Sequence, residues 1–252
     1  SIARLEADDE ISEEVDAPMF GTILHAAVQT LYARIAGEAH PGETLRAMIR
    51  TGEVAQAVEA AINQNYLQDK HATAEDYSGN LLLVKDIVIR YLRGGVMPYD
   101  AAHDAFSVSG LEEPVAYPFR FRAGGRDLEM KFAGIADRID TLDDGALRVV
   151  DYKTGGKDFQ LKEVYCGLDC QMLLYLFTLE RNAGDKFPGA AAAGVEYLLA
   201  DPAPESVPRA EAGQGDEENN YPLNGLLLDD ESVYRAMDTR GTGDFVPLNF
   251  SA

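Results

Sequence analysis

Two apolar runs that each end in an aspartate constrain the fold of this chain more than any other feature. The first run, Met130 to Ala136, precedes Asp137, and the second, Ala146 to Val150, precedes Asp151. Apolar residues alternate or cluster in both runs, as expected of half-buried strands. Asp143-Asp144-Gly145 lies between them and is typical of a hairpin turn. We therefore predict that the two runs pair as an antiparallel hairpin.

In such a hairpin Asp137 and Asp151 lie side by side on one face, with Lys153 two residues further along it. A carboxylate just past an apolar strand costs free energy unless it is paired or bound to a cation. Lys153 then either neutralises the aspartates as a structural ion pair, or orients an attacking water beside a carboxylate-bound metal ion. The second arrangement is the minimal equipment for metal-assisted cleavage of a phosphodiester.

Three other aspartates of the hairpin are expected to play structural roles. They are Asp140, Asp143 and Asp144. Isolated aspartates at strand ends usually cap a turn or pair with a neighbouring base.

Length and hydropathy predict a globular protein with a sizeable core. With 252 residues and 46% hydrophobic content, the chain suits one large domain or a domain with a helical subdomain. No run approaches the length of a membrane-spanning helix. The acidic start, Ser1 to Asp16, lacks the basic region and apolar core of a signal peptide. We expect a soluble cytoplasmic protein with no membrane partner.

The net charge of −21 has the wrong sign for a protein that binds nucleic acid through its whole surface. The acidic residues are concentrated, however, in Glu6 to Asp16 and Asp201 to Asn220, which we expect to be a surface arm (1–17) and a long loop. Basic residues instead gather near the predicted hairpin, where they are compatible with a local positive groove: Arg120, Arg122, Arg126, Lys131, Arg138, Lys153, Lys157 and Lys162.

Apolar spacing predicts helices through the first third of the chain. They are expected over Pro18 to Ala36, Thr44 to Arg50, Glu53 to Gln68 and Tyr77 to Arg93, the last closed by Gly94-Gly95. His25 lies in the middle of the first of these helices. A lone histidine there is either a hydrogen-bonded core residue or a nitrogen ligand to the same metal from the helical side.

The remainder of the chain predicts a sheet with further helices. Short alternating runs from Ala105 to Val150, separated by Gly124-Gly125 and Asp144-Gly145, indicate three or four antiparallel strands. A helix over Lys162 to Arg181, a buried strand over Ala191 to Leu199 and a short helix over Asp230 to Met237 follow. This order indicates an α/β sandwich with a mixed sheet covered by helices.

Two residue pairs fall in the predicted helix over Lys162 to Arg181. Cys166 and Cys170 are four residues apart, which suits burial on one side of a helix, and neither a disulfide nor a complete metal site is expected. Gln171 and Tyr175 share a helix face in the same way. They either satisfy polar groups at the core edge, or line a groove and touch DNA or a catalytic residue.

Four motifs together resemble the RecB-family branch of the PD-(D/E)XK nucleases in both order and spacing. They are Gly21 to His25, Gly134 to Asp140, Asp151-Tyr152-Lys153, and Gln171 to Tyr175. Glu163 to Leu168, Gly225 to Asp229 and Tyr234 to Asp238 are in addition similar to the C-terminal nuclease domain of AddB-type helicase–nuclease subunits. The resemblance covers about Met19 to Asp238, nearly the whole chain.

The resemblance implies a restriction-endonuclease-like fold, in which a central mixed β-sheet is flanked by helices and preceded by an N-terminal helical region. Residues 18–252 would form one nuclease domain. Its expected parts are a helical region over about 18–95, a catalytic sheet core over about 105–200, the acidic loop over about 201–220 and a C-terminal helix over about 230–238.

The resemblance also implies roles for individual residues. Asp137, Asp151, the imidazole of His25 and the backbone carbonyl of Tyr152 would hold Mg²⁺ or Mn²⁺, and Lys153 would position the nucleophilic water. Gln171 and Tyr175 match a QxxxY motif that lies near the DNA. Glu113 stands where relatives often have an acidic residue before the metal-binding hairpin, and Glu112 fits almost as well.

The implied function is hydrolysis of phosphodiesters in single-stranded DNA delivered by a helicase partner, in double-strand-break repair and recombination. The alternatives are a nuclease-fold module that has lost activity and serves as a DNA-binding or scaffolding element, and a metal-binding structural domain of unrelated function. Intact His25, Asp137, Asp151 and Lys153 argue against lost activity.

Many AddB-type nuclease domains carry four flanking cysteines that bind an iron–sulfur cluster. Neither Cys166 nor Cys170 lies at a matching place, so no iron–sulfur cluster is expected in this chain. The sequence contains no helicase motif and begins close to the His25 helix. We expect it to be an excised domain of a larger protein, with such cysteines outside the fragment.

Overall fold

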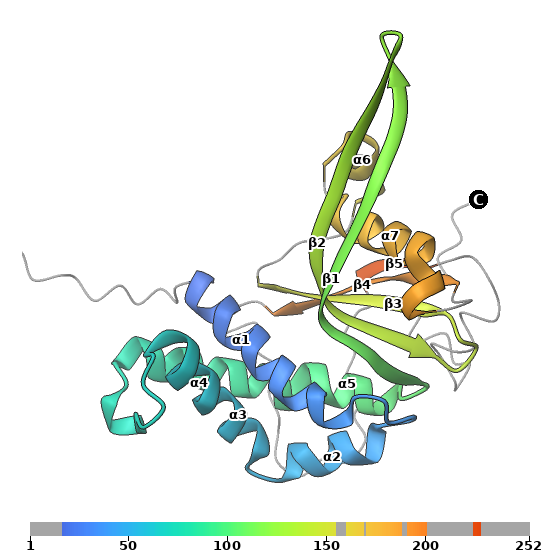
Figure 1. Cartoon of the computed structure of the whole chain (residues 1–252). Helices are drawn as coiled ribbons and strands as arrows, with labels where there is room; N and C mark the ends of the chain where they lie inside the picture. The colour runs from blue at the N-terminus through green and yellow to red at the C-terminus, as the bar shows by residue number, and fades with distance from the viewer. Residues whose placement is uncertain (1–16, 155–159, 169, 188–190, 201–223, 228–252) are drawn as a thin grey trace, which may run out of the picture.

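The computed structural model describes residues 17–154, 160–168, 170–187, 191–200 and 224–227. Within them, an N-terminal helical region packs against one side of a mixed sheet, and helix α7 (Gln171–Lys186) lies on the other side (Figure 1). The predicted α/β class with a mixed sheet flanked by helices is confirmed. None of the helices described is both long and apolar enough to cross a bilayer.

The first third is helical, as predicted. Its elements are α1 (Ala17–Tyr32), η1 (Ala33–Ile35), α2 (Gly42–Arg50), α3 (Glu53–Ala61), η2 (Ile62–Tyr66), η3 (Ala74–Asp76), α4 (Gly79–Tyr91), η4 (Leu92–Val96) and α5 (Met97–Ala102). Helix α1 is the centre of this region because its apolar stripe is fully buried: Phe20, Ile23, Leu24 and Ala27 have no exposed surface.

The predicted helix end at Gly94-Gly95 is wrong. A glycine closes a helix by adopting a left-handed conformation, and neither of these two has a positive φ. The chain instead continues through the π-helical η4 into α5. Leu92, Val96 and Met97 are buried in the core, which keeps this segment helical.

The sheet has the order β1-β2-β3-β4-β5. Its strands are β1 (Phe106–Ala123), β2 (Arg126–Leu142), β3 (Leu147–Thr154), β4 (Ala192–Ala200) and β5 (Asn224–Leu227). Neighbouring strands are antiparallel except β3 and β4, which are parallel and are therefore joined by a crossover that carries α6 (Leu161–Tyr165) and α7. The strand predicted over Ala191 to Leu199 is β4.

The predicted hairpin is confirmed as β2 and β3. Leu142 donates to the carbonyl oxygen of Ala146 at 2.8 Å, and Gly145 has the left-handed φ of 83° that this turn requires. Asp144 accepts from the backbone of Ala146 at 2.9 Å, the turn-capping role expected of it. Because β2 and β3 pair antiparallel, the ends of the two strands that carry Asp137 and Asp151 meet at one edge of the hairpin.

The predicted helix over Lys162 to Arg181 is broken into α6 and α7. Gly167 adopts a φ of 78° just after α6, which ends that helix in the usual way. The prediction that Cys166 and Cys170 share one buried helix face is consequently wrong, because Cys166 is exposed and Cys170 is half-buried. The acidic loop at 201–220, the helix at 230–238 and all but the last residue of the 1–17 arm lie outside the described residues.

A buried ionic network joins the helical region to the sheet. Arg138 of β2 has no exposed surface and donates to Asp100 of α5 at 2.7 and 3.1 Å, to Asp140 at 2.9 and 3.1 Å, and to the hydroxyl of Tyr152 at 2.8 Å. Arg148 also donates to Asp140, at 2.7 Å. Asp140 therefore has the structural role predicted for it, whereas Arg138 is not part of a surface groove.

Breaking this network should cost more stability than any surface pair. Burial alone would raise the pKa of Asp100, but the charge of Arg138 outweighs it and lowers that pKa. We expect Asp100→Asn to lower the free energy of unfolding by about 3–5 kcal/mol, because Arg138 then keeps an uncompensated buried charge. Urea unfolding measures this. Asp86→Asn, which breaks the exposed Arg90–Asp86 pair, is the matched control and should cost at most about 1 kcal/mol.

Candidate functional site

The site forms where β2 and β3 stop pairing. Their register runs from Thr141 opposite Leu147 to Arg138 opposite Val150. Beyond it, the backbone N–H of Tyr152 donates at 3.0 Å to a side-chain oxygen of Asp137. The Asp137 carboxylate thus caps the end of the ladder, and its position is tied to the backbone of β3.

His25 reaches this point from α1. Gly21, one turn earlier, lies beside Thr154 at the end of β3, and His25 follows on the same helix face. Its Nε2 is 2.9 Å from the carbonyl oxygen of Tyr152, and its Nδ1 is 3.4 Å from Oδ2 of Asp137. The helix and the sheet therefore bring together the three groups that the resemblance named for a metal ion.

The acidic residue from β1 is Glu112. One ligand atom each from His25, Glu112 and Asp137 lies within 4.8 Å of the other two, and Glu113 is not in this group. Glu113 pairs with Ala136 in the ladder, whereas Glu112 has a left-handed φ of 46°. That conformation is unfavourable for a non-glycine residue and typical of functional sites. The sequence left both glutamates open, and the backbone of β1 selects Glu112.

The neighbouring glutamates provide a matched pair for a metal-binding test. We expect Glu112→Gln to weaken Mn²⁺ binding by about tenfold or more, because it removes a carboxylate from the cluster. Glu113→Gln makes the same chemical change one residue away and should leave the affinity nearly unchanged. Isothermal titration calorimetry compares the two. A larger loss in Glu113→Gln would place the ligand at the other glutamate.

The Asp137 carboxylate is held in an environment that disfavours its charge. Burial, reinforced by the neighbouring charge of Asp151 and by Glu112, raises the pKa of Asp137 to about 6, against the opposing effects of His25 and of the Tyr152 N–H. A carboxylate with a raised pKa, next to a second carboxylate, is stabilised when a cation binds.

Asp151 and Lys153 form an ion pair beside this cluster. Asp151 is 3% exposed, and Nζ of Lys153 lies 2.8 Å from its Oδ2. That oxygen nevertheless accepts no hydrogen bond within the described structure, because the ammonium approaches it outside hydrogen-bonding geometry. The close contact is consistent with an ion pair, and the buried oxygen keeps the capacity to bind a further cation or donor.

Gln171 and Tyr175 share one face of α7, as predicted. Gln171 Nε2 donates to the Tyr175 hydroxyl at 2.8 Å, and Tyr175 is buried against β2. The ring requires Gly134, since a Cβ there would come within 2.4 Å of it. Gly134 is three residues before Asp137 on β2, about 10 Å along the strand, so the pair lies next to the cluster.

The donor set fits a hard divalent cation. It combines carboxylate oxygens from Asp137 and Glu112, the Tyr152 carbonyl oxygen and an imidazole nitrogen. Oxygen ligands suit Mg²⁺, and a mixed oxygen and imidazole set suits Mn²⁺. The orphaned buried oxygen of Asp151 points to the same conclusion.

Comparison with known proteins identifies relatives of one kind, all of them subunits of ATP-dependent helicase/deoxyribonucleases. The chain is 36% identical over 131 residues to such a protein from Clostridium botulinum, which covers 46% of this chain and 11% of the relative. It is 35% identical over 146 residues to the Acetivibrio thermocellus protein, covering 50% and 12%. The Bacillus thuringiensis protein is 27% identical over 254 residues, covering 92% of this chain and 21% of the relative.

The chain thus spans about a fifth or less of the length of these relatives. The model of the PD-(D/E)XK nuclease superfamily matches residues 1–239. Because that match includes all four motifs and most of the chain, the protein belongs to the PD-(D/E)XK nuclease superfamily.

Proposed function

We propose that this chain is a Mg²⁺- or Mn²⁺-dependent deoxyribonuclease domain. It hydrolyses phosphodiester bonds in single-stranded DNA delivered by a helicase, as the exonuclease part of a RecB/AddB-type helicase–nuclease acting in double-strand-break repair and recombination in the cytoplasm. The observation that carries the proposal is the convergence of His25, Glu112 and Asp137 beside the Asp151–Lys153 pair.

The metal ligands are supplied by three elements of the fold. Asp137, Asp151 and the Tyr152 carbonyl come from the sheet, His25 comes from α1, and Glu112 comes from the irregular turn of β1. When bound, the ion polarises the phosphate and lowers the pKa of its water. Because each ligand is held by a different element, the site is present only when helix and sheet are packed together.

Lys153 acts on the reacting groups. Asp151 holds its ammonium group at 2.8 Å, so Lys153 is oriented before DNA binds. From there the ammonium positions the attacking water and offsets the negative charge that develops on the phosphate. Water adds to phosphorus, the bond to the leaving oxygen breaks, and that oxygen takes a proton. Gln171 and Tyr175 line the approach of the DNA.

The names of the relatives support the choice of substrate and partner. Each is named as a subunit of an ATP-dependent helicase/deoxyribonuclease. Delivery by a helicase also accounts for a net charge of −21, since the affinity for DNA need not come from this domain alone.

The direct test is incubation of the chain with end-labelled single-stranded and duplex DNA in Mn²⁺, Mg²⁺ or EDTA. We expect cleavage of the single strand with either metal and none in EDTA. Cleavage that persists in EDTA would contradict the proposal. Binding of Mn²⁺ and DNA without any cleavage would instead favour the inactive scaffolding module.

A further inference from the structure

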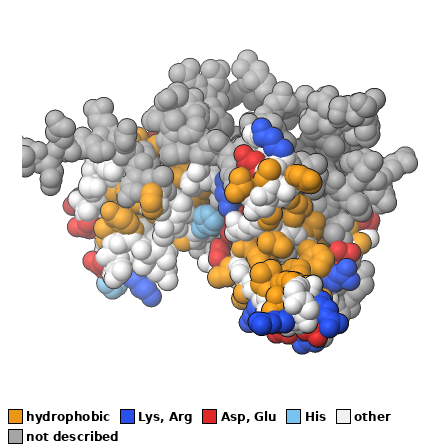
Figure 2. All heavy atoms as spheres, turned by 90° about the horizontal axis from the view of Figure 1, so that it is seen from above, with side chains coloured by type: hydrophobic (Ala, Val, Ile, Leu, Met, Phe, Trp, Pro, Cys, Tyr) orange, Lys and Arg blue, Asp and Glu red, His pale blue; other side chains and the backbone are white. Residues whose placement is uncertain are grey.

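Beyond the site, β1 and β2 continue as a two-stranded arm that projects from the body of the protein (Figure 1). We define the arm as residues 115–134. Across its strands Tyr117 pairs with Phe132, Phe119 with Met130 and Phe121 with Leu128, so one face of the arm is apolar. Phe121 and Met130 are 47% and 58% exposed. Figure 2 shows hydrophobic side chains along the arm, with Lys and Arg gathered at its end.

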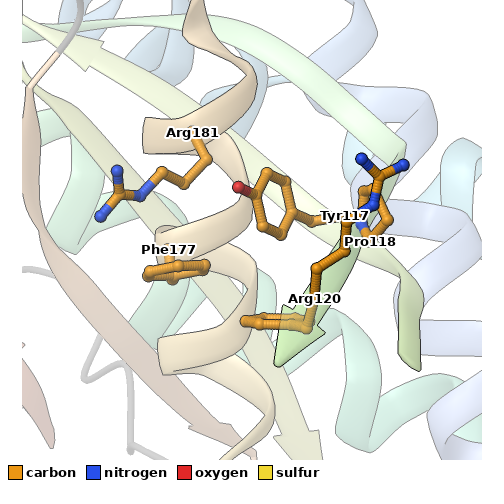
Figure 3. Close-up of a pocket in the computed structure, with 6 residues that line it drawn as sticks. Tyr117, Pro118, Arg120, Phe177 and Arg181 are labelled. Carbon is orange, nitrogen blue, oxygen red and sulfur yellow. The ribbon is translucent and has the colours of Figure 1, made fainter. Parts of the chain in front are cut away.

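Helix α7 meets the arm at a pocket of about 440 Å³. Its lining comes from β1 and α7: Tyr117, Pro118, Phe119, Arg120, Phe177 and Arg181 (Figure 3). The rings of Phe119 and Phe177 are stacked, with 5.3 Å between centroids and 16° between planes. Tyr117 stands edge-on to both, at 5.2 and 5.6 Å. Because all three side chains are only half-buried, they present ring surface to a ligand.

The pocket is positively charged on an acidic protein. Arg181 lies 5.2 Å above the Phe177 ring and pairs with no carboxylate of the described residues. Arg120 pairs with Glu129, but both side chains are largely exposed, so a phosphate can compete for this arginine. Aromatic rings combined with arginines are the groups that bind unpaired bases and their phosphates.

An aromatic path connects this pocket with the candidate site. The ring of Phe132 is 5.7 Å from that of Tyr175, and on its other side Phe132 pairs across the arm with Tyr117. Tyr117 lies five residues from Glu112 along β1, about 16 Å. A strand that passes through the site can therefore reach the pocket.

We propose that Tyr117, Phe119 and Phe177 form a base-stacking subsite for single-stranded DNA, and that Arg120 and Arg181 bind its phosphates. The inference rests on the proposed function and specifies where the substrate lies outside the metal cluster. A single strand fits better than a duplex, whose bases are already stacked on one another. It also fits better than an apolar protein segment, which has no phosphates for the two arginines.

The test measures binding without cleavage. Fluorescence anisotropy of a labelled oligothymidylate is recorded in EDTA, with the wild type, Phe177→Leu and Phe177→Tyr. Leucine keeps an apolar side chain but cannot stack, so we expect at least about fivefold weaker binding, whereas tyrosine retains the wild-type affinity. An abasic strand of the same length should bind the wild type and Phe177→Leu equally, because no base is left to stack.

The phosphate contacts are tested by salt dependence. Arg181→Gln should reduce the slope of log affinity against log salt concentration by about 0.7, the value for one contact to a single strand. Arg90→Gln makes the same change at an exposed arginine of α4 and should leave the slope unchanged.

Three outcomes overturn the subsite: no measurable binding of oligothymidylate by the wild type, unchanged affinity in Phe177→Leu, or an equal loss on the abasic strand. These results do not depend on catalysis. A protein that shows base-dependent binding in EDTA but never cleaves keeps the subsite and loses the proposed function. A protein that cleaves but binds equally after Phe177→Leu loses only the subsite.

Discussion

Asp151→Asn and Lys153→Gln are each expected to slow cleavage of single-stranded DNA by at least about 10²-fold. Lys153 loses the charge that offsets the developing phosphate charge, and Asp151→Asn removes both a metal ligand and the partner that holds the ammonium at 2.8 Å. The measurement is the single-turnover cleavage rate at saturating Mn²⁺, with folding checked by circular dichroism.

The same experiment separates catalysis from a purely structural ion pair. Lys85→Gln breaks a comparable Lys85–Glu59 pair in the helical region, and it should leave the cleavage rate unchanged. If the Asp151–Lys153 pair were only structural, Lys153→Gln would lower the unfolding temperature but cleave at the wild-type rate wherever it remains folded.

Asp137→Asn is expected to abolish Mn²⁺ binding and cleavage while making the metal-free protein more stable. The pKa of Asp137 is raised to about 6, chiefly by burial, so its charged form destabilises the fold at neutral pH. Asparagine keeps an oxygen acceptor for the Tyr152 N–H and carries no charge. The gain should be on the order of 2 kcal/mol in urea unfolding at pH 7.5 in EDTA. Such a gain would show that the site is retained at a cost in stability.

The pH dependence gives the sign of this effect. The unfolded carboxyl loses its proton near its ordinary pKa of 3.8, whereas the folded one keeps it until about pH 6. Stability of the metal-free wild type relative to Asp137→Asn therefore falls as the pH rises through this window. The advantage of Asp137→Asn should be small at pH 4 and full above pH 7. An advantage that is equal at both pH values, or wild-type Mn²⁺ binding by the variant, would contradict this account.

Local sequence patterns were sufficient for the sheet and for its neighbouring acidic residues. Alternating apolar runs and the Asp143-Asp144-Gly145 turn predict the β2–β3 hairpin, because strand period and turn chemistry are local properties. An antiparallel hairpin then places Asp137 close to Asp151. The predicted helix face of Gln171 and Tyr175 follows from the spacing of four residues in the same way.

Other features depended on contacts between distant segments. Arg138 belongs to the predicted basic surface by its position in the sequence, but Asp100, 38 residues earlier, draws it into the core. The continuation of the chain past Gly94-Gly95 was equally unpredictable, because burial of Leu92 and Val96 overrides a local stop signal.

By itself, the sequence determined the mixed α/β class, the strand ends that carry Asp137, Asp151 and Lys153, and the resemblance that singled out His25. Only the tertiary structure decided that Glu112 rather than Glu113 joins the cluster, and that α7 and the arm enclose a pocket of aromatic and basic side chains. The physical reason is the same in both cases. The left-handed backbone at Glu112 and the crossing of α7 over the arm arise from long-range packing, which no local pattern of residues encodes.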